Sequence, residues 1–175
     1  MFGFGKEKSN GLDQATEEAF KILYLGMARQ YMQSGIFFDA ANSDPYLAGF
    51  ISFSIEFEST RASTKFHVSK DQIRLVITGV VLKLYGEAAK SVFAYINKLD
   101  EEGNADYMKG IQNADKFACF KIGRRKLEDD IEYNQALFHG KALDPEAPDD
   151  MAAVIGYQIL WFHSQMREFV FTRKH

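Results

Sequence analysis

The chain has 175 residues, of which 46% are hydrophobic, 26% are charged and three are proline. At roughly 150 residues per domain this length predicts one domain, and the composition excludes collagen-like, disulfide-scaffold and disordered chains. The formal net charge of −3 and the isoelectric point near 5.8 provide no long-range attraction for a polyanion. We therefore expect no nucleic-acid partner.

Helical patterning begins after an N-terminal tail of residues 1–12. Glutamates in an early turn and Ser34-Gly35 after the segment predict a first helix over residues 13–33. No internal repeat or low-complexity tract follows. These features predict a single helical domain over residues 13–172.

The next segment fits two kinds of structure. Asp44-Pro45 predicts a helix N-terminus, because the carboxylate caps free amides and proline suits the first helical position. Every second residue that follows is apolar, as in a half-buried strand: Ile51, Phe53, Ile55 and Phe57. A helix is favoured, because the only nearby pairing segment is 65–68 and an isolated hairpin is marginal in water. A small β-hairpin within residues 50–68 is the alternative.

The longest apolar stripe at helical spacing runs from Ser69 to Leu99. Ser69 and Gln72 form a capping box at its start, so we expect residues 69–99 to be the central core helix. Gly103 ends this segment and Asn104 caps the next helix.

Gly123 is expected to interrupt that next helix before Ile131 and Phe138 continue its apolar stripe. Residues 139–150 contain two prolines and predict a surface loop, after which Asp149 or Asp150 opens the last helix. Together these segments predict an all-α protein, a compact bundle of about five helices around the central helix 69–99.

The sequence lacks the short motifs that carry common chemistries. It contains no phosphate-binding loop, no dinucleotide-binding glycine pattern, no zinc-protease motif and no nucleophile elbow. We therefore expect no cofactor, and the sequence leans against an enzyme without excluding one.

Three polar residues form the only candidate cluster for a metal or for acid–base chemistry. Glu132 and His139 are two helical turns apart, and His163 lies on the last predicted helix. If the two helices packed together, these side chains could line an inter-helical pocket for a small molecule or a metal ion. The simpler interpretation is that the histidines are hydrogen-bonded or exposed.

An apolar surplus predicts association with another chain. Aromatic residues make up 14% of the sequence, and the first and last helices are apolar over more than one core-facing stripe. We expect a non-catalytic helical protein that forms a homodimer or docks a protein partner on the last helix, through Tyr157, Trp161 and Phe171. The alternative is that loops and the N-terminal tail cover these faces.

The expected location is the cytoplasm. The single cysteine, Cys119, has no partner for an internal disulfide, and we expect no export signal. No apolar stretch approaches the ~20 residues needed to span a bilayer, so an integral membrane protein is not expected. Phe2 and Phe4 offer the alternative of a weak peripheral contact with a membrane surface.

Overall fold

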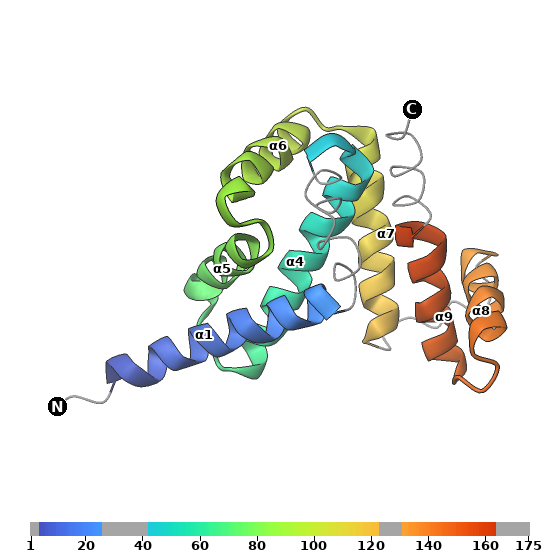
Figure 1. Ribbon diagram of the computed structural model, residues 1–175, viewed down its shortest axis with the longest axis horizontal. Coiled ribbons are helices and arrows are strands. Elements are labelled where there is room, and N and C mark those ends of the chain that lie inside the picture. The colour runs from blue at the N-terminus through green and yellow to red at the C-terminus, as the bar shows by residue number, and fades with distance from the viewer. Residues whose placement is uncertain (1–3, 26–41, 123–130, 164–175) are drawn as a thin grey trace.

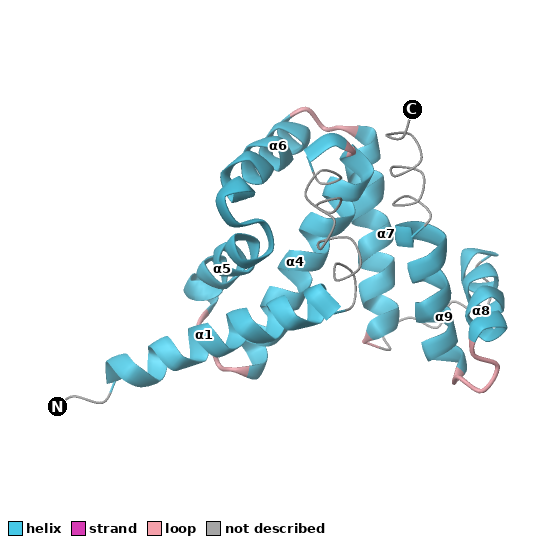
Figure 2. Ribbon diagram, viewed as in Figure 1, coloured by secondary structure: helices cyan, strands magenta, loops and turns pink. Residues whose placement is uncertain are grey.

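The computed structural model describes residues 4–25, 42–122 and 131–163 (Figure 1, Figure 2). Within these three ranges no residue lies in a strand, which confirms the all-α class. The elements are, in chain order, α1 (Phe4–Leu23), α4 (Pro45–Lys65), the 3-10 turn η2 (Lys70–Gln72), α5 (Ile73–Tyr85), the 3-10 turn η3 (Gly86–Ala88), α6 (Ala89–Glu101), α7 (Ala105–Lys121), α8 (Ile131–Leu143), α9 (Asp149–Tyr157) and the π-helical segment η4 (Gln158–His163).

Helix α4 occupies the centre of the fold. It contacts α1, α5, α6 and α7, and Leu47, Phe50 and Ile51 near its start are almost completely buried. Asp44 caps it as predicted, since its Oδ1 accepts a hydrogen bond of 3.0 Å from the backbone N–H of Leu47. Every residue from Tyr46 to Ile51 is buried, and α1, α5, α6 and α7 are arranged around α4 (Figure 1).

The alternative of a β-hairpin within residues 50–68 is wrong, because α4 continues through Lys65. The alternation that suggested a strand consists of two pairs at helical i,i+4 spacing. Ile51 and Ile55 are buried, whereas Phe53 and Phe57 are partly exposed and stack with ring centroids 6.4 Å apart. The apolar residues at every second position therefore belong to two neighbouring stripes of one helix.

The prediction of one central helix over residues 69–99 is also wrong. Ser69 donates a hydrogen bond to the Gln72 side chain instead of capping the backbone, and a 3-10 turn precedes α5. The segment then breaks at Gly86, whose φ of 55° lies in the left-handed region that favours glycine. Because α5 and α6 are separate, and α7 and α8 are separate too, the described helices exceed the five expected.

The start of α7 agrees with the sequence. Gly103 has a φ of 60° and ends the preceding turn. Asn104 then accepts hydrogen bonds of 3.1 Å from the backbone N–H groups of Asp106 and Tyr107. The expected interruption at Gly123 lies outside the described residues.

Other helix boundaries differ from expectation. Helix α1 begins at Phe4, ahead of the predicted start at Asp13. Gly11 lies inside α1, where an added Cβ would be 3.1 Å from the carbonyl oxygen of Phe66. Helix α8 continues to Leu143, so the predicted loop is shorter, whereas α9 begins at Asp149 as expected.

Two glycines bring the backbones of α4 and α7 together. A Cβ added at Gly49 would overlap the backbone carbonyl of Tyr107, and one added at Gly110 would overlap the carbonyl of Tyr46. Each helix thus places a glycine three residues after a tyrosine and opposite the tyrosine of its neighbour. The absence of a side chain at both positions is what permits this approach.

The two tyrosine hydroxyls tie the same helices together. The Tyr46 hydroxyl accepts a hydrogen bond of 2.9 Å from the Asn113 amide, and the Tyr107 hydroxyl lies 3.3 Å from the Ser52 hydroxyl. Burial raises the pKa of both tyrosines above the ordinary value, because the phenolate would lose its hydration. Both hydroxyls therefore stay protonated as structural links.

Helices α8 and α9 meet through a second reciprocal contact. A Cβ at Gly140 of α8 would overlap the carbonyl of Ala152, and one at Gly156 of α9 would overlap the carbonyl of Ala136. Each helix carries the pattern Ala-x-x-x-Gly, and alanine faces glycine at both crossings. Small residues thus form the points of closest contact between α8 and α9.

We predict that Gly110→Ala and Gly140→Ala each lower the free energy of unfolding by about 1–3 kcal/mol, because the helix backbones must separate. Helix propensity alone would raise the free energy of unfolding by about 1 kcal/mol, because alanine favours a helix more than glycine does. Urea denaturation followed by circular dichroism measures whether the free energy of unfolding falls or rises. Gln112→Ala at an exposed position of α7 is the control and changes the value by less than about 0.5 kcal/mol. Stabilised glycine variants would contradict the close contact.

Candidate functional site

The predicted partner anchors do not form an exposed cluster in the described part of the chain. Tyr157 in α9 is fully buried and packs with Ala136 of α8. Its ring centroid lies 4.1 Å from that of Trp161 in η4, which is partly buried. Phe171 lies outside the described residues. Tyr157 and Trp161 therefore hold α9 and η4 against neighbouring helices, and their use by a partner stays a prediction.

Trp161 also belongs to a contact between three elements. The Lys116 ammonium of α7 lies 5.9 Å from the centroid of the Trp161 ring and 2.6 Å from Glu132 Oε2 of α8. Phe117 of α7 packs against both the main core and the cluster formed by α8 and α9. One cation and two aromatic rings thus join the α8–α9 pair to the rest of the fold.

The proposed metal or acid–base cluster gains no support from the residues that can be placed. Glu132 is paired with Lys116, and His139 is exposed, with its ring edge against Phe138 at 5.7 Å between centroids. The His163 side chain lies outside the described part, so convergence of the three residues stays a prediction. Within residues 4–25, 42–122 and 131–163, no group of three or more His, Cys, Asp or Glu side chains could hold a metal ion.

The outer side of α8 exposes large apolar residues. Ile131 is 75% exposed and Phe138 is 71% exposed. They lie seven residues apart, so both project from the same side of the helix. We call this side the α8 face, and it comprises Ile131, Asn134, Gln135, Phe138, His139 and Ala142. It contains no Asp, Glu, Lys or Arg, which is unusual for an exposed helix face.

The orientation of α8 corrects the expectation that Ile131 and Phe138 continue a core stripe. The inner side of the helix carries Ala136 and Gly140, which lie against α9. The partly buried Tyr133 packs beside these small residues, whereas the large apolar residues Ile131 and Phe138 lie outside. The signal that could have revealed this is the Ala-x-x-x-Gly pattern shared with residues 152–156.

Helix α5 has a second exposed apolar side, but charges flank it. Leu75 is 56% exposed and Leu82 is 53% exposed. Arg74 and Lys83 are exposed beside them. Lys83 is also 2.9 Å from Glu17 Oε2 of α1, so part of this side helps to hold α1. We call Arg74, Leu75, Thr78, Leu82 and Lys83 the α5 face.

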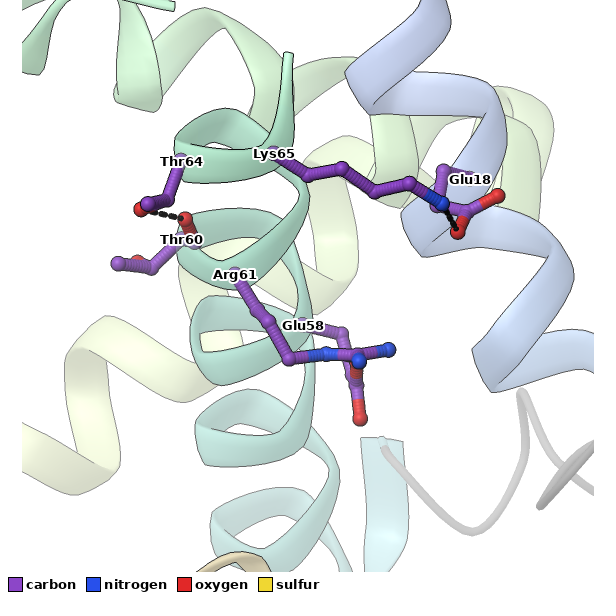
Figure 3. Close-up of polar contacts among 6 residues, drawn as sticks. All are labelled: Glu18, Glu58, Thr60, Arg61, Thr64 and Lys65. Atoms are coloured by element: carbon purple, nitrogen blue, oxygen red, sulfur yellow. Dashed lines mark hydrogen bonds and ion pairs between the residues drawn. The ribbon is translucent and has the colours of Figure 1, made fainter. Parts of the chain in front are cut away.

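Adjacent glutamates attach α1 to two different helices. Lys65 of α4 donates a hydrogen bond of 2.6 Å to Glu18, and Lys83 of α5 reaches Glu17 (Figure 3 shows the first pair). Each lysine lowers the pKa of its glutamate, chiefly through this hydrogen bond. The pairs are exposed to solvent, so they orient α1 more than they stabilise it.

A carboxylate is buried in the second half of α4. Glu58 is only 4% exposed, and its Oε2 accepts a hydrogen bond of 2.8 Å from Arg61 Nε (Figure 3). Ser59 and Ser63 are buried on the same helix, and their hydroxyls have no hydrogen-bond partner among the described residues. The arginine neutralises the carboxylate, and the serines provide small side chains in a packed region. Arg61 itself stays exposed, so the ion pair lies at the edge of the packed region.

Comparison of the chain with protein-family models, with curated proteins and with solved structures finds no match. In the described ranges no helix combines the length and apolar character needed to cross a membrane. The α8 face, with its exposed apolar residues and absence of formal charge, is therefore the candidate functional site on geometric grounds.

We predict that Lys116→Met lowers the free energy of unfolding by about 0.5–1.5 kcal/mol, because a partly exposed ion pair and a cation–π contact are both lost. Trp161 is the only tryptophan, so its fluorescence maximum should shift in the folded state. The control is Lys98→Met, which removes an exposed pair with Glu102 and leaves the emission unchanged. An unaltered spectrum for the Lys116 variant contradicts the contact.

Proposed function

We propose that this chain is a non-catalytic, cytoplasmic helical protein that acts by docking another protein chain on the α8 face. The observation that carries the proposal is the exposure of Ile131 and Phe138 on a side of α8 without formal charge. The centres of protein interfaces are depleted in charged residues and enriched in aromatic ones. The α8 face has both properties.

Energetics support docking at this position. Single exposed apolar residues are common on proteins and need no explanation. Ile131 and Phe138, however, share one side of a helix, so one partner surface can cover both. Full burial of side chains of this size contributes about 1.5–3 kcal/mol each before the cost of association is subtracted.

The α8 face is also held in place from behind. The backbone contact of Ala136 and Gly140 with α9 fixes the inner side of the helix. On the outer side, the ring centroids of His139 and Phe138 are 5.7 Å apart. A surface that is ordered before binding loses less entropy when a partner arrives, which favours affinity.

This proposal keeps the class of function expected from the sequence but moves the docking surface. The aromatic pair of Tyr157 and Trp161 packs within the chain, where Tyr157 supports α8 through Ala136. Partner contact is assigned instead to the opposite side of α8. The two roles are complementary, because the buried pair positions the helix that presents Ile131 and Phe138.

We predict that a photo-crosslinking residue, p-benzoylphenylalanine, placed at position 138 of the full chain gives a discrete crosslinked product in the cells that make the protein. Ile131→Glu should abolish this product, since it places a charge in the apolar contact. The same photo-crosslinker at Thr60, which is exposed on α4, is the control and gives no such product. Absence of a product at position 138, or equal products at both positions, overturns the proposal.

A further inference from the structure

We infer that the chain docked on the α8 face is a second copy of the same chain, with the two α8 helices antiparallel about a two-fold axis; this inference rests on the proposed function. A two-fold interface uses one patch on both copies, so that patch must match itself when its direction is reversed. The α8 face meets this requirement in the order of its residues and in its absence of formal charge.

The order of residues along the α8 face is self-complementary. An axis passing between Asn134 and Gln135 places Ile131 of each copy opposite Phe138 of the other, so that two identical apolar pairs form. The amides of Asn134 and Gln135 lie between those pairs. A side-chain amide both donates and accepts hydrogen bonds, so the exposed Gln135 amide beside the axis can pair with its own copy.

The α8 face and the α5 face differ in the charged residues that they contain. The α8 face has no Asp, Glu, Lys or Arg, so two copies meet there without opposing like charges. The same two-fold operation on the α5 face, centred between Leu75 and Leu82, places Arg74 opposite Lys83 of the second copy. Like charges placed directly opposite are unfavourable. Of the two faces, the α8 face is therefore the one suited to self-pairing.

The position of α8 leaves room for a second copy. Helix α9 lies between α7 and α8, and α8 forms the edge of the molecule (Figure 1). The residues that contact α9, Ala136 and Gly140, are on the opposite side from Ile131 and Phe138. Two such helices can pack at the usual separation of about 8–10 Å without displacing any described helix.

The oligomeric state of the purified full chain tests this inference. An interface formed by one helix face per copy belongs to the small, weak class. We expect the mean mass in sedimentation equilibrium to rise from 19.9 kDa toward twice that value at concentrations on the order of 10–100 µM. Phe138→Glu should remain monomeric over this range. Leu82→Glu, the matched change on the α5 face, should dimerise like the unmodified chain.

A cysteine crosslink tests whether position 135 lies beside the two-fold axis, without altering an apolar residue of the α8 face. In a Cys119→Ser background, which removes the only native cysteine, Gln135→Cys should form a disulfide-linked dimer under mild oxidation. Thr78→Cys, at the corresponding point of the α5 face, is the control and should stay monomeric. Because Gln135 is exposed, its replacement does not depend on core packing.

The outcomes separate this inference from the proposed function. A chain that stays monomeric at 500 µM and does not crosslink through position 135 overturns the second copy as the occupant. In that case a crosslink from position 138 to a different chain would still support docking on the α8 face. A dimer that Leu82→Glu dissociates and Phe138→Glu does not also overturns the inference. A product from position 138 of twice the chain mass, together with the disulfide-linked dimer, supports it.

Discussion

Close backbone contact at four glycines determines how the main helix pairs of this protein form. Gly49 and Gly110 bring α4 against α7, and Gly140 and Gly156 bring α8 against α9. The separation of packed helices normally reflects the size of the side chains between them. Here each glycine faces a carbonyl of the neighbouring helix, so even a single added carbon has no space. The other helices are arranged around the α4–α7 pair, and Phe117, Trp161 and Lys116 connect the α8–α9 pair to it.

The close backbone contact between α8 and α9 also determines which side of α8 carries the candidate site. Ala136 and Gly140 lie directly against the α9 backbone, so this strip of α8 holds no large side chain, and Tyr133 packs beside it. Ile131 and Phe138 must then project from the other side of α8. Their exposure is a consequence of the helix pairing and is not a local irregularity. Packing and the proposed docking surface are thus two sides of one helix.

Features set by local chemistry could be predicted from the sequence. Asp44 caps α4 because a carboxylate next to proline satisfies free amides at a helix start, and Asn104 acts in the same way at α7. The break at Gly86 could not be predicted from periodicity, because a glycine within an apolar stripe is compatible with a continuous helix. Its positive φ becomes evident only from the way α5 and α6 pack around α4. The central position of α4 was missed for a related reason, since burial on all sides removes the one-sided pattern that marks a core-facing helix.

The candidate site was harder to predict than the fold, because composition measures the amount of apolar surface and not its location. The excess of aromatic residues indicated that some apolar surface would remain uncovered, and the sequence prediction placed the docking surface on the last helix. Tyr157 and Trp161 pack within the chain, so that helix is used for internal support. The uncovered surface instead lies on α8, whose matched small residues commit its other side to α9. Because Ala136 and Gly140 turn the opposite side of α8 toward α9, Ile131 and Phe138 stay mostly exposed and available to a partner.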